Sequence, residues 1–226
     1  MGCGFGQNQS IFSSLLDIGT RQDFASNDFT DVHHTRLDRG LCAADIAAQL
    51  KAAFVYRLPS LRSWGFAGRT ILGGWEMSGI LNWRDGYPYS VSSNYDANLD
   101  GNVNDRANLV GNPHLPAGRS EAARLQEWFN TAAFQNAGVG TDGSSPRDFL
   151  RGPRFSDLDY SLIKSFPIRH GPLKETQNIQ FRAEFFNIFN HPNFGSPVSQ
   201  VGSAQFGKIV SAGSPRIIQF ALKFTF

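Results

Sequence analysis

The chain has 226 residues, of which 13% are aromatic and only 18% are charged, against roughly 25% charged residues in an average soluble domain. Phenylalanine makes up most of the aromatic excess, with 20 Phe against 4 Trp and 5 Tyr. The 21 basic and 19 acidic residues give a net charge of +2 and form no long run of one sign, which argues against a nucleic-acid partner. No apolar run approaches the roughly 20 residues of a membrane-spanning helix.

A first strand is predicted at residues 50–57, because large apolar and polar side chains alternate there with the strand period of two. Pro59 follows closely and ends the strand, since proline has no N–H for a sheet ladder. One face of this strand carries Leu50, Ala52, Phe54 and Tyr56.

A second strand is predicted at residues 75–84 by the same alternation. A tryptophan lies near each end, Trp75 and Trp83. Aromatic side chains at both limits of a strand this long are typical of transmembrane barrels, whose apolar band is flanked by aromatic residues at both interfaces.

Two further strands are predicted at about 156–166 and about 177–190. Their apolar faces carry Leu158, Tyr160 and Leu162 in the first and Ile179, Phe181, Ala183 and Phe185 in the second. On the opposite face of the second strand, Arg182 and Glu184 are expected to form a charge pair that points into a lumen.

The last eleven residues, 216–226, form the clearest alternating strand of the chain. Its length and the bulk of its apolar face favour a membrane strand over the edge strand of a soluble sandwich. The apolar face consists of Ile218, Phe220, Leu222, Phe224 and Phe226.

The connections between these strands alternate between short and long. Residues 60–72 and 167–175 are short links, whereas about 70 residues separate Trp83 from Ser156 and about 25 separate Asn190 from Arg216. Antiparallel outer-membrane barrels have short periplasmic turns and long external loops. We therefore predict an all-β fold that is an antiparallel transmembrane β-barrel segment with long external loops.

Several stretches then carry a family resemblance, the most specific being residues 181–195, Phe-Arg-Ala-Glu-Phe-Phe-Asn-Ile-Phe-Asn-His-Pro-Asn-Phe-Gly. Together with residues 73–80, 86–91, 105–113, 128–134 and 150–153, they resemble the C-terminal barrel region of TonB-dependent outer-membrane receptors. The closest likeness is to the Oar-like group, whose members begin with a carboxypeptidase regulatory-like domain. The resemblance covers about 38–226. Residues 1–46 are expected to be a poorly matched, loop-like stretch, and 47–226 the C-terminal barrel part, with an external loop at about 92–155.

The resemblance implies a barrel of 22 strands, of which this chain would supply about five or six. The signal peptide, regulatory domain and plug of such receptors are missing from the sequence, so we expect a C-terminal fragment that cannot close a barrel alone. The implied partners are outer-membrane lipid, the remainder of the receptor barrel with its plug, and the barrel-assembly machinery. The implied location is the outer membrane of a Gram-negative-type bacterium.

The terminal strand also has an expected role in assembly. By resemblance to outer-membrane proteins in general, an alternating strand that ends in Phe226 is the signal read by the barrel-assembly machinery. Recognition would proceed by strand addition to an exposed sheet edge. The expected signal residues are Ile218, Phe220, Leu222, Phe224 and Phe226.

Residues 96–105 fit the calcium-loop opening D-x-N-x-D-G, in which alternate side chains supply oxygen ligands and Gly101 permits the sharp turn. The twelfth position is Ala107 rather than the bidentate glutamate of an EF-hand, and Asp105 would supply that carboxylate. The alternative is a polar external loop without metal. The candidate ligands are Asp96, Asn98, Asp100, Asn102, Asn104 and Asp105.

No G-x-S-x-G, H-E-x-x-H or Walker motif occurs, so we expect no enzyme and no cofactor apart from calcium at residues 96–105. We expect the intact protein to be a receptor that takes up a bulky nutrient, a carbohydrate or a chelate, across the outer membrane. The alternative function is a soluble calcium-dependent β-sandwich binding module.

Overall fold

The computed structural model describes residues 38–59, 65, 71–101, 105–168 and 177–225. These residues fall into two compact units. We call the first the sheet unit, formed by the described residues of 48–84, 154–193 and 212–225. The second is the loop unit, formed by those of 38–47, 85–153 and 194–211. Each unit is described by itself.

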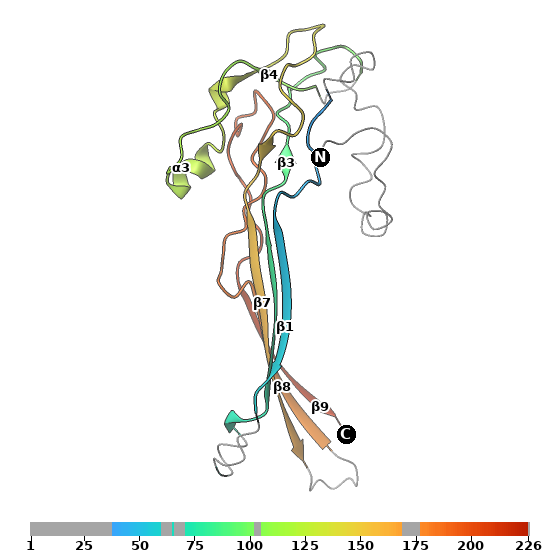
Figure 1. Cartoon of the computed structure of the whole chain (residues 1–226), viewed down its shortest axis with the longest axis vertical. Coiled ribbons are helices and arrows are strands. Elements are labelled where there is room, and N and C mark those ends of the chain that lie inside the picture. The colour runs from blue at the N-terminus through green and yellow to red at the C-terminus, as the bar shows by residue number, and fades with distance from the viewer. Residues whose placement is uncertain (1–37, 60–64, 66–70, 102–104, 169–176, 226) are drawn as a thin grey trace. The chain divides into compact units, whose positions relative to one another are not determined.

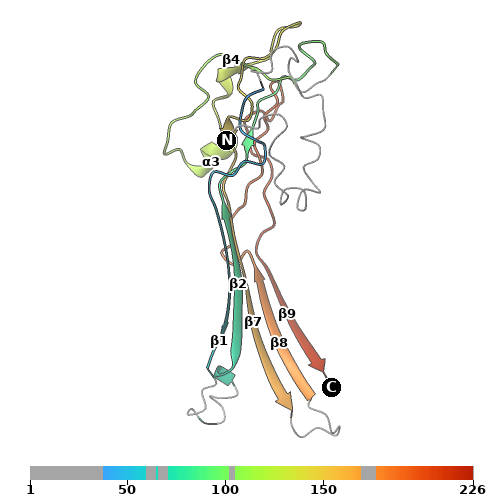
Figure 2. The same cartoon turned by 45° about the vertical axis from the view of Figure 1, so that its right-hand side comes forward.

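The sheet unit contains one five-stranded sheet (Figure 1). The strands follow the order β1-β2-β7-β8-β9, and each neighbouring pair is antiparallel, as Figure 2 shows with the strands side by side. The all-β, antiparallel prediction is therefore confirmed. The strands are β1(Gln49–Arg57), β2(Trp75–Arg84), β7(Phe155–Ile168), β8(Gln177–Phe186) and β9(Ile217–Thr225).

The predicted strand ends agree with the observed ends to within one or two residues, with one exception. The strand predicted at 177–190 ends at Phe186, because Asn187 has a φ of 49° and Asn190 a φ of 51°. Both are in the left-handed region, which a continuing strand cannot adopt and which asparagine tolerates better than most residues. The four residues after Phe186 are therefore a turn.

The register of the sheet brings the predicted apolar faces together. Residues directly opposite each other in an antiparallel pair point to the same side. Phe54 faces Gly79, which in turn faces Tyr160. Tyr160 faces Phe185, which faces Ile218. Most large apolar side chains of the five strands therefore form one continuous face, here called the apolar face. The opposite face, here called the polar face, carries most of the charged and polar side chains together with a few apolar ones such as Ile80 and Ile163.

The loop unit is built from short elements. Its strands pair two by two, β3 with β6 and β4 with β5, and Ser120 caps the one-and-a-half-turn helix α3 by accepting a hydrogen bond from the Ala123 N–H. In the described part of the chain, no helix has the length and apolar character needed to cross a membrane. The elements are β3(Pro88–Tyr89), β4(Asn108–Leu109), α3(Glu121–Gln126), η3(Thr131–Ala133), β5(Phe134–Gln135) and β6(Leu150–Arg151).

A small hydrophobic core holds the loop unit together. Its centre is aromatic: the Phe129 ring lies 5.4 Å from that of Phe134 and 5.3 Å from that of Phe206, both edge to face. Edge-to-face pairs add roughly 0.5–1.5 kcal/mol each to the area that the rings bury. The long connection between β2 and β7 is therefore a packed structure. The buried residues of the core are Val91, Ala107, Phe129, Ala133, Phe134 and Leu150.

Candidate functional site

The apolar face of the sheet is the main candidate site. Large side chains on it are exposed, with Phe220 at 68% and Leu222 at 75% of full exposure. Soluble proteins rarely leave contiguous apolar patches of more than a few hundred Å² uncovered, and larger ones mark protein or membrane contact. A sheet with one bulky apolar face and one polar face suits a wall between lipid and water.

Side chains on the apolar face are packed against their cross-strand neighbours. Phe181 on β8 lies edge to face with Trp75, with 6.1 Å between ring centroids, and stacks on Phe220 of β9 at 6.2 Å. On β1, the Phe54 ring covers Gly79, where a Cβ atom would lie only 2.6 Å from the ring. A glycine covered by a cross-strand aromatic ring loses less pairing stability than a bare one. These contacts link the apolar side chains of neighbouring strands to one another.

On this face, tryptophans lie near both ends of β2, as noted in the sequence. β2 has ten residues from Trp75 to Arg84, which at about 3.3 Å per residue and a tilt of about 40° covers roughly 25 Å, the height of the apolar band of an outer-membrane barrel. Trp83 also carries a cation on its ring, since the Arg154 guanidinium lies 6.0 Å from its centroid. Tryptophan with arginine at a strand limit fits a membrane interface.

Lys164 is a charged residue on the apolar face. Its side chain is buried, and its ammonium group donates hydrogen bonds to the carbonyl oxygens of Ile71 and Gly73. The rings of Trp75 and Phe166 lie 5.3 and 5.4 Å from Nζ. The charge is thereby satisfied by backbone dipoles and aromatic faces at the limit of the face.

The polar face carries one ion pair between neighbouring strands and one within β8. Arg57 Nε lies 2.7 Å from Glu76 Oε2. Arg182 Nη1 lies 3.4 Å from Glu184 Oε1, and Gln219 donates to Glu184 Oε2 at 2.7 Å. The Arg182–Glu184 charge pair expected from the sequence is therefore present, on the face opposite the phenylalanines.

The predicted assembly strand is β9, which pairs with β8 along nine register positions. Its residues Ile218, Phe220, Leu222 and Phe224 lie on the apolar face opposite Phe185, Ala183, Phe181 and Ile179. Phe226 lies outside the described residues. Every residue of β9 from Ile217 to Thr225 is exposed, as expected for the outer strand of a sheet.

The predicted calcium loop is a tight turn stabilised by its own carboxylates. Asp96 accepts hydrogen bonds from the backbone N–H groups of Leu99 and Gly101, at 2.7 and 2.9 Å. Asp105 is buried and accepts from the N–H groups of Ala97 and Asn98. The oxygens thus serve as caps for the turn. Asn102 and Asn104 lie outside the described residues, and among the described residues no group of three or more His, Cys, Asp or Glu is arranged to hold a metal.

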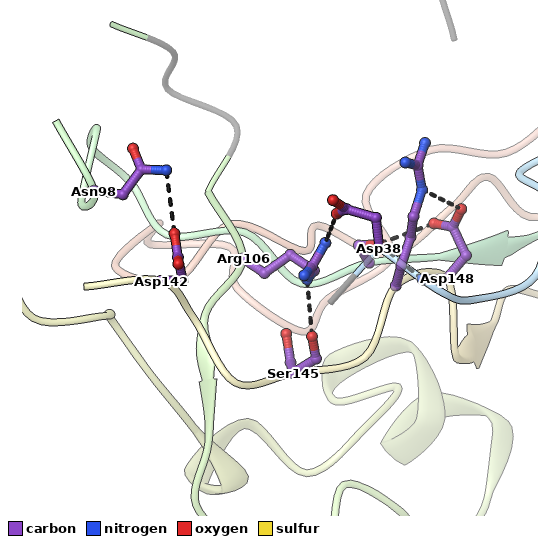
Figure 3. Close-up of polar contacts among 8 residues, drawn as sticks. Asp38, Asn98, Arg106, Asp142, Ser145 and Asp148 are labelled. Atoms are coloured by element: carbon purple, nitrogen blue, oxygen red, sulfur yellow. Dashed lines mark hydrogen bonds and ion pairs between the residues drawn. The ribbon is translucent and has the colours of Figure 1, made fainter. Parts of the chain in front are cut away.

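A buried ion pair beside this loop was missed by sequence reasoning. Arg106 Nη1 lies 2.7 Å from Asp38 Oδ1, with side chains 7% and 3% exposed, and Arg106 Nε donates to the Ser145 carbonyl at 2.9 Å (Figure 3). Figure 3 also shows the hydrogen bond from Asn98 to Asp142, at 3.2 Å. Asp38 and Arg106 are 68 positions apart, so no local pattern links them. Removing either partner would take an opposite charge away from a buried ionic group, which costs several kcal/mol.

Residues 181–195 form a strand followed by a hydrogen-bonded turn. The first part is β8, and the second part is the turn, which the Asn187 side chain ties together: Oδ1 accepts from the His191 N–H and Nδ2 donates to the His191 carbonyl, both at 2.9 Å. Asn193 Oδ1 accepts from the Ser156 N–H at 2.8 Å. The asparagines of this stretch therefore cap the loop end of β7 and β8.

Comparison with known proteins agrees with this geometry. A family model described as an outer membrane beta barrel domain matches residues 10–219, which include all of β1, β2, β7 and β8 and the start of β9. No curated protein and no solved structure matches the chain.

Proposed function

The chain belongs to the outer membrane beta barrel domain family, and on that premise we propose that it forms part of the wall of a TonB-dependent receptor of the Oar-like group. The intact receptor would take up a bulky nutrient, a carbohydrate or a chelate, across the outer membrane of a Gram-negative-type bacterium. The role is transport rather than catalysis.

One observation carries this proposal: most of the large apolar residues of the five strands share a single face in unbroken register, while the other face holds the ion pairs. Lipid on the first side and water on the second satisfy both faces. The sheet has five strands, fewer than the eight of the smallest outer-membrane barrels. We propose that the remaining strands, and a plug, come from receptor sequence outside the described residues.

The outer edge of β9 has a second proposed role, in assembly. Its nine exposed residues and its alternating aromatic face fit strand addition, in which main-chain hydrogen bonds supply affinity and alternate side chains supply specificity. The proposed partner is the barrel-assembly machinery. Deleting Phe226 from an assembled receptor is expected to lower membrane yield, and an unchanged yield would contradict this role.

A matched pair of cysteine variants tests the membrane assignment. In a chain whose two cysteines are replaced by serine, Leu162→Cys places a thiol on the apolar face and Ser161→Cys places one on the polar face. In isolated outer membranes, we expect a water-soluble maleimide to label residue 161 and to spare residue 162. Equal labelling of both, or recovery of the chain as a soluble monomer without detergent, would favour a soluble sandwich instead.

Transport is tested separately from membrane insertion. Loss of the gene and loss of TonB are expected to abolish growth on the same nutrient. Normal growth of the gene-deleted strain on each carbohydrate and chelate that needs TonB would contradict the transport role.

A further inference from the structure

We propose that a cleft on the polar face of the sheet binds a small anion, a carboxylate or phosphate compound. The cleft has a volume of about 340 Å³ and lies near the ends of the strands that the shorter connections join. Its lining includes Arg57, Glu76, Ser165, Gln180 and Arg182. This inference rests on the proposed function in one respect: it requires that the polar face borders water.

The register places the two arginines on opposite sides of the cleft. Arg57 faces Glu76, which faces Ile163, which faces Arg182. Three strand spacings of about 4.8 Å put the two Cα atoms roughly 14 Å apart, and Ile163 lines the cleft between them. A small anion fits between the two guanidinium groups.

Both guanidinium groups keep hydrogen-bond donors for a ligand. Arg57 binds Glu76 through Nε, which leaves its two terminal nitrogens, and its side chain is 82% exposed. Arg182 binds Glu184 through Nη1, which leaves Nε and Nη2. Guanidinium groups bind carboxylate and phosphate oxygens through paired N–H donors.

The floor and one rim of the cleft add further groups. The Gln180 carboxamide donates to the Ser165 hydroxyl at 3.4 Å, a long and weak bond that a ligand oxygen can replace. Lys223 is exposed and faces Gln180 in the register. Among the described residues around the cleft, the three cations Arg57, Arg182 and Lys223 outnumber the two carboxylates of Glu76 and Glu184.

The test is a titration of the intact receptor that contains this chain, in detergent micelles, with inorganic phosphate and with succinate. Tryptophan fluorescence follows the titration, because Trp75 also lines the cleft. We expect a saturable change in wild type and at least a tenfold weaker affinity in Arg57→Gln and in Arg182→Gln, since a hydrogen bond to a charged group is lost. Glu76→Gln is expected to strengthen binding a few fold, because it removes a competing negative charge. Lys51→Gln, at the other end of the same face, is the matched control and is expected to change nothing.

The outcomes separate this inference from the proposed function. The anion site alone is overturned if a protein that inserts into vesicles shows no saturable change in fluorescence. It is also overturned if Arg57→Gln and Arg182→Gln leave the fluorescence change intact. Weaker rather than stronger binding in Glu76→Gln also overturns it, because an anion site must gain affinity when a neighbouring negative charge is removed. Anion binding by a chain that does not insert into vesicles supports the site and contradicts the barrel wall.

Discussion

Phenylalanine has opposite environments in the two units. In the loop unit, Phe129 and Phe134 are buried at 3% and 5% exposure in a shared core. In the sheet unit, the phenylalanines of β9 stand on an exposed face. The loop unit is organised like a soluble domain with its apolar residues inside, whereas the sheet is organised for a surrounding that is itself apolar. The phenylalanine excess therefore has two causes, and composition alone cannot separate them.

The largest expected effect is in the loop-unit core. Phe129→Ala removes a ring that contacts Phe134, Phe206 and Tyr89, and we expect it to destabilise the loop unit by about 3–5 kcal/mol. Hydrogen exchange of the Ala107 amide, which donates to the Val91 carbonyl, measures the loss. The control is Phe189→Ala, since Phe189 is 76% exposed; a similar loss in both variants would contradict the burial contrast.

The buried ion pair should come next. Asp38→Asn leaves the Arg106 guanidinium buried without its carboxylate, and we expect a loss of about 3 kcal/mol in the loop unit. Urea unfolding followed by Trp128 fluorescence measures it. Asp38→Asn combined with Arg106→Met is expected to recover part of the loss, because both buried charges are then removed together. An additive double variant would show that the two residues do not act as a pair.

A charge on the sheet distinguishes its two faces. Leu162→Arg puts an arginine on the apolar face near mid-strand and is expected to cost about 2–4 kcal/mol in a lipid bilayer. Ser161→Arg, one residue earlier on the polar face, is expected to cost less than 0.5 kcal/mol, as surface substitutions usually do. Urea titration of the vesicle-inserted receptor that contains this chain measures both costs, and equal costs would contradict a difference between the two faces.

The smallest effect concerns Tyr89 and alkaline pH. Burial raises the pKa of the Tyr89 hydroxyl above its ordinary value of 10, and this oxygen has no hydrogen-bond partner among the described residues. Above pH 10 the unfolded chain releases the proton while the folded chain keeps it, so stability falls as pH rises, by roughly 1 kcal/mol between pH 10 and 11. Tyr89→Phe is expected to reduce this loss, measured by urea unfolding at pH 8 and pH 11. If wild type and Tyr89→Phe lost the same unfolding free energy between pH 8 and pH 11, residues other than Tyr89 would cause the pH dependence.

The two units also differ in how far the sequence predicts them. The five long strands were found because a period of two over nine or more residues is a local signal, and Trp75 and Trp83 marked the limits of the second one. The turn at Asn187 was not predicted, because a single asparagine in the left-handed conformation produces no periodic pattern in the sequence. It ended β8 four residues before the predicted end.

Long-range packing explains what was missed in the loop unit. Its strands have two residues each, too few to show any alternation. Its core joins Phe129 and Phe134 to Phe206, more than 70 positions later, and its ion pair joins Asp38 to Arg106. The cleft could not be predicted from the sequence, because its residues come together only through the register of four strands. The lengths of the turns and loops in the sequence do not specify that register. Sequence therefore predicted the faces of the sheet and left the partners across it unknown.

An accessibility scan along β2 tests the central claim, that one face of the sheet meets lipid, most directly. Nitroxide labels are placed one at a time from residue 75 to residue 84 in the vesicle-inserted receptor that contains this chain. They report collisions with oxygen, which dissolves in lipid, and with a water-soluble nickel complex. The account predicts a period of two, with oxygen favoured at Met77, Gly79 and Leu81 and nickel favoured at Glu76, Ser78 and Asn82. A scan without that period, or with the two phases exchanged, would contradict it.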